Sequence, residues 1–530
     1  MMMQPAAGRP PTQPCPAGPP PGIATGEGEG TTPPDDRSGA AALTAAPTAP
    51  TAPTAPTAPS LAPAAASPAA TREQLRRLIR TIEARPASTL ADAPAPPRIE
   101  APQTIEDALP GAWTREPSGV LTSMRVYALD HVHGAQPLSD LRAATGPMLA
   151  LLGRDPAFAR RTHTDLLFLD IETTGLGGAG AMVFLVTTGR IEVMHGLEGG
   201  GADGGTERFV LRQYLAPSPA EEGALLAQLT ADCMQGSAGF PLLTPSPFTG
   251  ALPGEGTEKS SGGGGLGGVT PTHPRTERPL LTTYNGRGFD APMLDQRATM
   301  HRMRAGYEAM DHLDLLATVR RGFRGLIPSC RLAQIEVTAL GVTRPSDEVA
   351  GGEVPVWYFR YLRTGDARYL APLIAHNAYD VLSLAALTGR LAAVAGGTRS
   401  GSALERLAAG RLHLAHGKHA EAALHLEAAA AALDDGWARD EALLSLATLH
   451  RRAGRREHAA ALWARIAHRA DAPGAARAHP LTELAKHHEH RERDPAAALA
   501  LVERAIEAAG ETPALVHRRR RLLRKLAATS

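Results

Sequence analysis

The sequence of 530 residues predicts an α/β domain with a mixed central sheet and flanking helices, followed by an all-α domain of helical repeats, behind a disordered N-terminus. Three observations lead to this fold class. Residues 102–397 alternate between strand-like and helix-like apolar patterns, which is typical of layered α/β domains. Residues 401–530 are rich in Ala and Leu, keep a helical period and repeat themselves. Residues 1–100 lack the apolar side chains that a core requires.

The N-terminal region consists largely of Ala, Pro, Thr and Gly and includes the repeat APTAPTAPTAPTAPS. Because this composition cannot bury a core, we predict disorder with polyproline-like stretches over 1–100. One short helix is predicted at 71–85, where Thr71 can cap the first turn. This helix is either a solvated element of a linker or a basic docking element.

Strand-like and helix-like segments succeed one another within the α/β domain. Short apolar runs predict strands at 166–172, 182–194, 207–215 and 279–285. Helical periodicity predicts helices at 219–232, 289–304, 331–340 and 367–395. Three strands, a helix, a strand and further helices describe a mixed sheet with helices on its faces.

A segment rich in Gly, Pro and Ser interrupts this domain at 235–278. A stretch of this length without helix or strand pattern is unsuited to a core. We therefore predict that it is a surface insertion.

Charge and cysteine content exclude several kinds of protein. The net charge is +1, so a nucleic acid would be held by local charge or by metal ions rather than by a uniformly basic surface. The cysteines Cys15, Cys233 and Cys330 lack CxxC spacing, which argues against a structural zinc site and a disulfide scaffold. The sequence shows neither a run of about 18 apolar residues nor the layout of a signal peptide. We expect a cytoplasmic protein that does not bind a membrane.

Two acids lie inside an apolar strand pattern, LLFLDIETTGL at 166–176. Asp170 and Glu172 are two residues apart, so on a strand they share one face. Two like charges beside a core repel each other and lose hydration unless something compensates them. Surface acids on an edge strand are the alternative interpretation.

Two further acids lie where core residues would be expected. Asp290 follows a strand and turn at the start of a predicted helix, and Asp380 lies in an otherwise apolar helix. Four inward-facing carboxylates make physical sense around Mg²⁺ or Mn²⁺, since hard cations prefer carboxylate oxygen. A pair of such ions can activate water and stabilise the leaving oxygen of a phosphodiester. For Asp290, capping of the helix is an alternative or additional role.

At this point the sequence resembles a known group of enzymes. The segments FLDIETTGL, YNGRGFDAPML and HNAYDVLSL are similar to the three exonuclease motifs of the DnaQ-like, or DEDD, 3′–5′ exonucleases of the ribonuclease H-like superfamily. The YprB-type family of that superfamily is the closer match, through HLDLLATVRR, SCRLAQIEVTALGVTR and WYFRYLRTGD as well. The resemblance spans about 105–510 apart from the Gly-rich insertion.

The resemblance implies an α/β ribonuclease H-like domain and a two-ion 3′–5′ exonuclease that acts on single-stranded ends of DNA or RNA. It implies that Asp170 binds both ions, while Glu172 and Asp380 bind the ion on the side of the nucleophile. It implies that Asp290 acts mostly through a bound water.

The fifth residue departs from the better-known patterns of this group, which carry a Tyr four residues before the last Asp or a His five residues before it. Here His376 stands four residues before Asp380. Residues i and i+4 share a helix face, so both can reach one site. An imidazole can deprotonate water near pH 7, which makes His376 a candidate base. A structural role beside the helix is the alternative.

Four residues are candidate contacts to nucleic acid. Thr173 and Gly175 follow the first two acids and could contact the terminal nucleotide through their backbone. Asn285 could bind a sugar and Phe289 could stack on a base, although Phe289 also suits the core. For the nearby Asp314 we favour a helix cap.

The C-terminal region repeats with a period of roughly 37 to 39 residues. The segments 410–429, 447–466 and 486–505 align, with Ala422, Ala459 and Ala498 at matched positions. This pattern resembles tetratricopeptide helical hairpins, and an ordinary Ala-rich bundle is the alternative. Such repeats could bind a partner protein. The basic run HRRRRLLRK at 517–525 either contacts phosphate or is a solvated helix end.

The sequence therefore indicates a metal-dependent nuclease. The rival interpretation is a non-catalytic scaffold, in which the ribonuclease H-like domain only holds nucleic acid and the repeats bind a partner protein.

The Gly-rich insertion supplies the first testable prediction. Excising 237–276 should leave a protein that folds and keeps its activity, because the excised residues contribute nothing to a core. Thermal unfolding and limited proteolysis of the full and shortened chains would check this. Loss of cooperative unfolding in the shortened chain would show that the segment is part of the fold.

Overall fold

A computed structural model of the chain describes residues 104–175, 180–194, 205–234, 278–344, 349–469 and 474–528. The predicted disordered region 1–100, its helix at 71–85 and all but the last residue of the insertion 235–278 lie outside these residues. Every element discussed below belongs to one compact unit, Ile99–Ser530.

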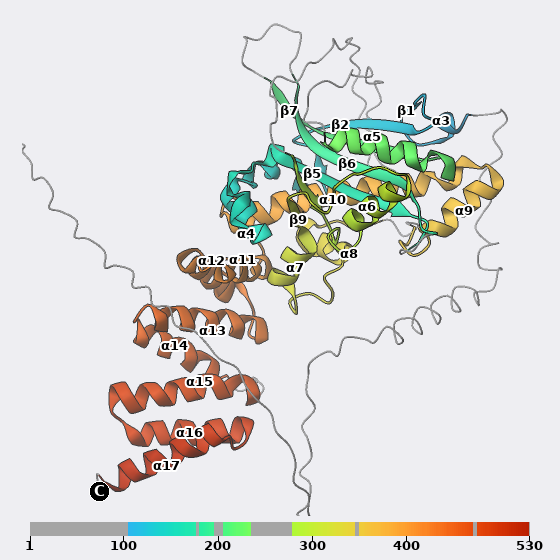
Figure 1. The fold of residues 1–530 in the computed structure, drawn as a ribbon. Coiled ribbons are helices and arrows are strands. Elements are labelled where there is room, and N and C mark those ends of the chain that lie inside the picture. The colour runs from blue at the N-terminus through green and yellow to red at the C-terminus, as the bar shows by residue number, and fades with distance from the viewer. Residues whose placement is uncertain are drawn as a thin grey trace, which may run out of the picture. The chain divides into compact units, whose positions relative to one another are not determined.

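A seven-stranded mixed sheet forms the centre of the first part of this unit, in the order β1-β2-β7-β6-β5-β8-β9 (Figure 1). The strands, in that order, are Trp113–Arg115, Leu121–Ala128, Thr206–Leu215, Val183–Met194, Leu166–Thr173, Leu280–Thr283 and His312–Asp314. Neighbours from β1 to β5 are antiparallel, whereas β8 pairs with β5 in parallel and β9 with β8. The predicted mixed sheet and its four predicted strands are confirmed.

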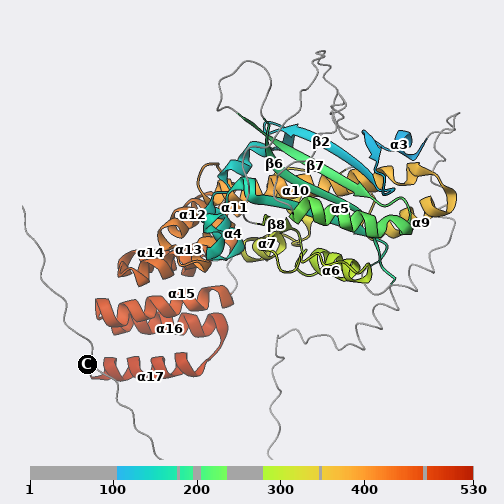
Figure 2. The same cartoon turned by 45° about the horizontal axis from the view of Figure 1, so that its top comes forward.

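Strand β5 lies between β6 and β8 and is covered on both faces. Leu167, Leu169 and Ile171 belong to a core with Leu226 and Leu229 of helix α5, Glu222–Met234. The residues of opposite parity, Leu166 and Phe168, belong to a second core that includes helix α10, Ala371–Ala395. Figure 2 shows α5 and α10 along opposite faces of the sheet. By parity, Asp170 and Glu172 lie on the α10 face.

Helix α10 is the main support of that face. Its sequence, APLIAHNAYDVLSLAALTGRLAAVA, is apolar almost throughout. Gly189 of β6 lets it approach closely, because a Cβ there would lie 2.8 Å from Val381 Cγ1. The segment Ala367–Ala395 is long and apolar enough to cross a membrane, but 83% of its most apolar window is buried inside the protein, as in a core helix.

The region 102–165, for which the sequence pattern predicted no elements, supplies the edge of the sheet. Besides β1 and β2 it contains α3 (Ile105–Ala108), β3 (Val132–His133), β4 (Gln136–Pro137) and α4 (Gly146–Gly153). These elements are short, and periodicity is a weak signal over so few residues. Two further helices lay outside the predicted ranges: α7 (Leu315–Phe323) and α9 (Val354–Thr364).

The helix predicted at 331–340 is not a single α-helix. It consists of one α-helical turn, α8 (Leu332–Ile335), followed by a π-helical turn, Glu336–Leu340. Gly341 ends it in the left-handed region with φ 65°. The predicted helix 289–304 is also shorter, since α6 spans Asp290–Met300.

The C-terminal region is all-α, as predicted (Figure 1). Its helices are α11 (Ala403–Ala415), α12 (His419–Ala432), α13 (Trp437–Arg452), α14 (Arg456–Ala467), α15 (Gly474–His487), α16 (Pro495–Ala509) and α17 (Pro513–Ala527). The matched residues Ala422, Ala459 and Ala498 are all fully buried, in α12, α14 and α16 respectively. The internal repeat therefore reflects equivalent positions in successive helical pairs.

Helix α11 joins the two parts through a shared core. Ala408, Ala409 and Leu412 belong to the same apolar cluster as Val319 and Phe323 of α7. A Cβ on Gly322 would lie 3.2 Å from Ala408 Cβ, so α7 and α11 pack closely. The first helix of the repeats is thus continuous with the core of the α/β domain.

Candidate active site on strand β5 and helix α10

The acids singled out in the sequence come together from three elements. Asp170 and Glu172 lie on β5, Asp290 is the first residue of α6, and Asp380 lies in α10. The pKa values of Asp170 and Glu172 are both raised well above normal, first by burial and then by the charges of Asp380 and Asp290. Residues far apart in the sequence therefore share one electrostatic environment.

His376 faces the same cluster from α10. Its Nε2 lies 3.7 Å from Glu172 Oε1 and 3.8 Å from Asp380 Oδ2. These separations are longer than direct hydrogen bonds, and a water molecule can bridge contacts of this length. The regular helix places His376 and Asp380 on one face, as their spacing predicts. Tyr379 lies instead against His133, with ring centroids 4.5 Å apart.

Asp170 is held from the α10 side by a buried hydrogen-bond chain. Asn377 donates from Nδ2 to Asp170 Oδ2 at 2.6 Å, and Thr187 of β6 donates to the amide oxygen of Asn377. Gln213 of β7 donates from Nε2 to Thr187 Oγ1 at 2.9 Å and to the carbonyl of Ile374 at 3.0 Å. Because Asn377, Thr187 and Gln213 are fully buried, this chain fixes the direction of the Asp170 carboxylate.

Asp290 is held between α6 and β5. It is 5% exposed. Its pKa is raised to about 7, first by burial and to a smaller extent by the charges of Asp314 and Asp380, while the backbone N–H groups of Asp290 and Ile171 act to lower it. Phe289, not Asp290, occupies the N-cap position of α6, so the capping alternative does not describe this helix.

The pKa of Asp380 is also raised by burial, although His376 and Arg344 act to lower it. Burial therefore disfavours the charged form of all four acids. A charged cluster is disfavoured here unless a cation compensates it.

Sequence reasoning missed the cation that the protein itself places at the site. Arg344 donates to Glu336 from both Nε and Nη2 at 2.6 Å, and it also donates to Asp380 Oδ1. Glu336 is fully buried in the π-helical turn. The one sequence signal is an acid inside the apolar run IEVTAL, since Arg344 lies 36 residues from Asp380 along the chain.

The residues predicted to contact nucleic acid differ in their exposure to solvent. Thr173 is 8% exposed, and its hydroxyl donates to the carbonyl of Gly175 at 2.7 Å. Strand β5 ends here with a β-bulge at 172–173, and the hydrogen bond holds the turn that follows. Phe289 packs against the core of the α5 face, so its core alternative is the one observed. Asn285 is exposed, with φ 72°.

Asp314 caps α7, as the sequence favoured. Its side chain accepts from Leu316 N at 3.0 Å. It also accepts from the backbone N–H groups of Asn285, at 2.9 Å, and Arg287, at 3.3 Å. Through these bonds it fixes the loop that leads to Asp290, and its charge adds to the raised pKa of that residue.

The donor set suits a divalent cation by charge and by atom type. Carboxylate oxygens are the preferred ligands of Mg²⁺ and Mn²⁺, and buried acids with raised pKa values gain most from a nearby positive charge. Within the described parts of the chain, no three His, Cys, Asp or Glu side chains converge as a finished metal site. Asn377 holds one oxygen of Asp170 and leaves the other available, whereas Asp380 is turned to Arg344 and would change partner when an ion binds.

The raised pKa values predict how the metal-free protein responds to pH. An acid whose pKa is higher in the folded than in the unfolded state stabilises the fold at low pH, and this contribution is lost as the pH rises through the folded pKa. With Asp290 at about 7, the unfolding free energy in the presence of EDTA should be lower at about pH 8 than at about pH 6.

Urea denaturation at the two pH values would measure this loss. The Asp290→Asn variant should show a smaller loss, because it has no proton to release. If the variant and the original protein lose the same unfolding free energy between the two pH values, burial does not raise the pKa of Asp290.

Comparison with known proteins agrees with this arrangement. Residues 272–392 match the family model described as RNase_H superfamily, a range that contains Asp290, Arg344, His376 and Asp380. The chain is 26% identical over 413 residues to "Uncharacterized protein YprB" of Bacillus subtilis, which covers 75% of this chain and 84% of that protein. The chain therefore contains a ribonuclease H-like superfamily domain and is homologous to YprB.

Proposed function

We propose that this protein is a metal-dependent nuclease that removes nucleotides from the 3′ ends of single-stranded nucleic acid, as a DnaQ-like exonuclease of the DEDD type. The observation that carries the proposal is the meeting of Asp170, Glu172, Asp290 and Asp380 in one buried, electrostatically strained cluster. Their presence within a ribonuclease H-like domain favours phosphodiester hydrolysis.

The four carboxylates would hold Mg²⁺ or Mn²⁺. When bound, two such ions supply activation of the attacking water and stabilisation of the leaving oxygen. Asp170 is the best oriented of the four, because the Asn377 chain fixes it while one oxygen remains for another partner. Carboxylate oxygens of Glu172 and Asp380 both lie near Nε2 of His376.

His376 is the proposed base. Its Nε2 faces both Glu172 and Asp380, which is where a water between these acids would lie. It would accept the proton of that water as the oxygen attacks phosphorus, and the two carboxylates would stabilise the imidazolium that forms.

Arg344 would exchange its partner Asp380 for a phosphate oxygen of the substrate. In this structure its guanidinium partly neutralises Asp380 and is anchored by Glu336. On ion binding, Asp380 would turn to the ion, while Glu336 would keep Arg344 beside the site. A guanidinium in that place can bind a phosphate oxygen of the substrate.

A non-catalytic scaffold is the second candidate, with the helical repeats, which we take to be tetratricopeptide-like, binding a partner protein. A scaffold would have no need for four mutually repelling buried acids and a histidine facing two of them. Cys233 and Cys330 are free thiols, which suits the cytoplasmic location that we propose.

The decisive experiment is cleavage of 5′- and 3′-labelled single strands of DNA and RNA in the presence of Mg²⁺ or Mn²⁺. We expect stepwise shortening from the 3′ end, no activity in EDTA, and loss of at least about 10³-fold in an Asp170→Asn/Glu172→Gln variant. Calorimetry should show loss of metal binding in the same variant.

The outcomes separate the candidates. Cleavage at internal sites would contradict the exonuclease assignment but not the nuclease. Binding of oligonucleotides without any cleavage, by protein that binds metal, would favour the scaffold.

The role of His376 makes a separate prediction. His376→Ala should lower turnover by about 10²-fold or more with little change in metal affinity, because a general base acts on the proton and not on the ion. His376→Tyr should restore part of the rate, since the spacing from Asp380 is that of the Tyr-type enzymes. If His376→Ala keeps full turnover but lowers the unfolding temperature, the residue is structural.

A further inference from the structure

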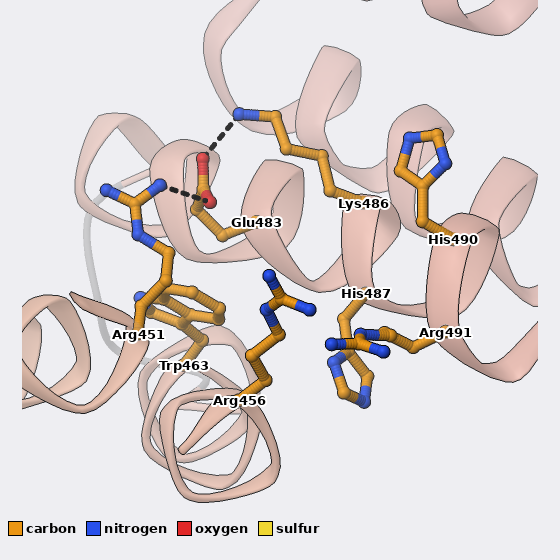
Figure 3. Close-up of a pocket in the computed structure, with 8 residues that line it drawn as sticks. All are labelled: Arg451, Arg456, Trp463, Glu483, Lys486, His487, His490 and Arg491. Atoms are coloured by element: carbon orange, nitrogen blue, oxygen red, sulfur yellow. Dashed lines mark hydrogen bonds and ion pairs between the residues drawn. The ribbon is translucent and has the colours of Figure 1, made fainter. Parts of the chain in front are cut away.

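The helical region contains a basic cavity that the proposed nuclease site does not use. Its volume is about 480 Å³, which is within the range of small-molecule sites. Arg451, Arg456, Lys486 and Arg491 line it (Figure 3). His487 lines it too.

Four successive elements build the cavity. Arg451 comes from the end of α13, Arg456 and Trp463 from α14, and Lys486 from the end of α15. The chain then enters a π-helical turn, His488–Glu492, which contributes His490 and Arg491 to the lining. Turns of this kind are rare and occur often at functional sites.

Acidic partners neutralise only part of the positive charge at the cavity, and outside the lining Glu492 Oε1 lies 3.3 Å from His487 Nε2. Glu483 is the one acid among its lining residues, and it pairs with Arg451 at 3.3 Å and with Lys486 at 2.5 Å (Figure 3). Arg456 and Arg491 have no acidic partner within the described part of the chain. Figure 3 shows Arg456 extending into the space between Trp463 and His487.

The nearby basic run at 517–525 is different, because part of it has an internal partner. Arg518, Arg521 and Lys525 of α17 all bind the buried carboxylate of Glu489. Burial acts to raise the pKa of Glu489, but the hydrogen bonds from Lys525 and Arg521 lower it to about 2. These three cations hold α17 in place against one carboxylate, so this part of the run has a structural role.

The wall of the cavity also has an unsatisfied donor. Trp463 is 4% exposed, and its indole nitrogen has no hydrogen-bond partner among the described residues. Buried donors without partners are rare in native proteins, and such a donor is commonly satisfied by a water molecule or a ligand.

We propose that this cavity binds phosphate groups of a single-stranded nucleic acid. The proposal rests on the proposed function, since it takes the ligand to be the strand on which the nuclease domain acts. Guanidinium groups bind phosphate oxygens bidentately, and ammonium and imidazolium groups add charge. The residues that line the cavity include no Asn, Gln, Ser or Thr to bind a peptide backbone, so an acidic peptide fits it less well.

Binding to a labelled single-stranded oligonucleotide of about 12 nucleotides tests the proposal, with the full chain in EDTA so that cleavage plays no part. Neutralising Arg456 and Arg491 together with Arg456→Gln and Arg491→Gln should weaken binding about ten-fold or more. The dependence of log affinity on log salt should fall by about 1.4, the value for two lost phosphate contacts on a single strand.

The matched control is Arg452→Gln with Arg465→Gln, two exposed arginines of α13 and α14 that lie outside the lining. It removes the same charge and should change the affinity less than about two-fold. Equal losses in the two double variants would overturn the proposal in favour of diffuse charge attraction. Thermal unfolding of both variants should match that of the original protein, because all four side chains are exposed.

Competition identifies the ligand. Inorganic pyrophosphate should displace the oligonucleotide, whereas a peptide of Asp and Glu at equal charge should not. Displacement by the peptide alone would overturn the proposal in favour of an acidic protein partner. Because binding is read without catalysis, cavity-dependent binding in a protein that never cleaves would reject the nuclease and leave the cavity assignment standing.

Discussion

The packing of α10 against β5 is the constraint on which the site depends. Alternation along β5 places Asp170 and Glu172 on the same face as Leu166 and Phe168, and that face is covered by the apolar helix. The acids are thereby withdrawn from water, and burial together with the charges of Asp380 and Asp290 raises the pKa of both. The surrounding polar groups, from the Asn377 chain to the Arg344–Glu336 pair, are the structural response to that buried charge.

The same helix connects the site to the repeats. At its C-terminal end the carbonyl of Ala395 accepts hydrogen bonds from His413, at 2.9 Å, and His425, at 3.0 Å. Arg390 pairs with Glu405 of α11 at 2.6 Å. Since α10 contributes His376 and Asp380 as well as these contacts, α11 is fixed relative to the candidate active site. The basic cavity begins only at the end of α13, beyond this junction.

Both π-helical turns of the described chain precede a left-handed residue and carry buried charge. The first places Glu336 where it anchors Arg344, and Gly341 ends it. The second contains Glu489, which anchors the cations of α17, and Arg493 ends it with φ 56°. In each case the buried acid of the turn binds arginine side chains from a later part of the chain. Such turns shift side chains off the regular helical stripe, and periodicity therefore does not reveal them.

The sequence by itself determined the elements that depend on local pattern. Apolar runs gave β5, β6 and β7, the helical period gave α10, and the internal repeat gave the paired helices, because each signal lies within one segment. It also marked the four acids, since a carboxylate in an apolar run is conspicuous. Only the tertiary structure decided what those acids contact. Arg344, Glu336 and Asn377 look ordinary in sequence, and their roles arise because distant segments meet across a sheet, where burial and charge act over distance in space and not along the chain.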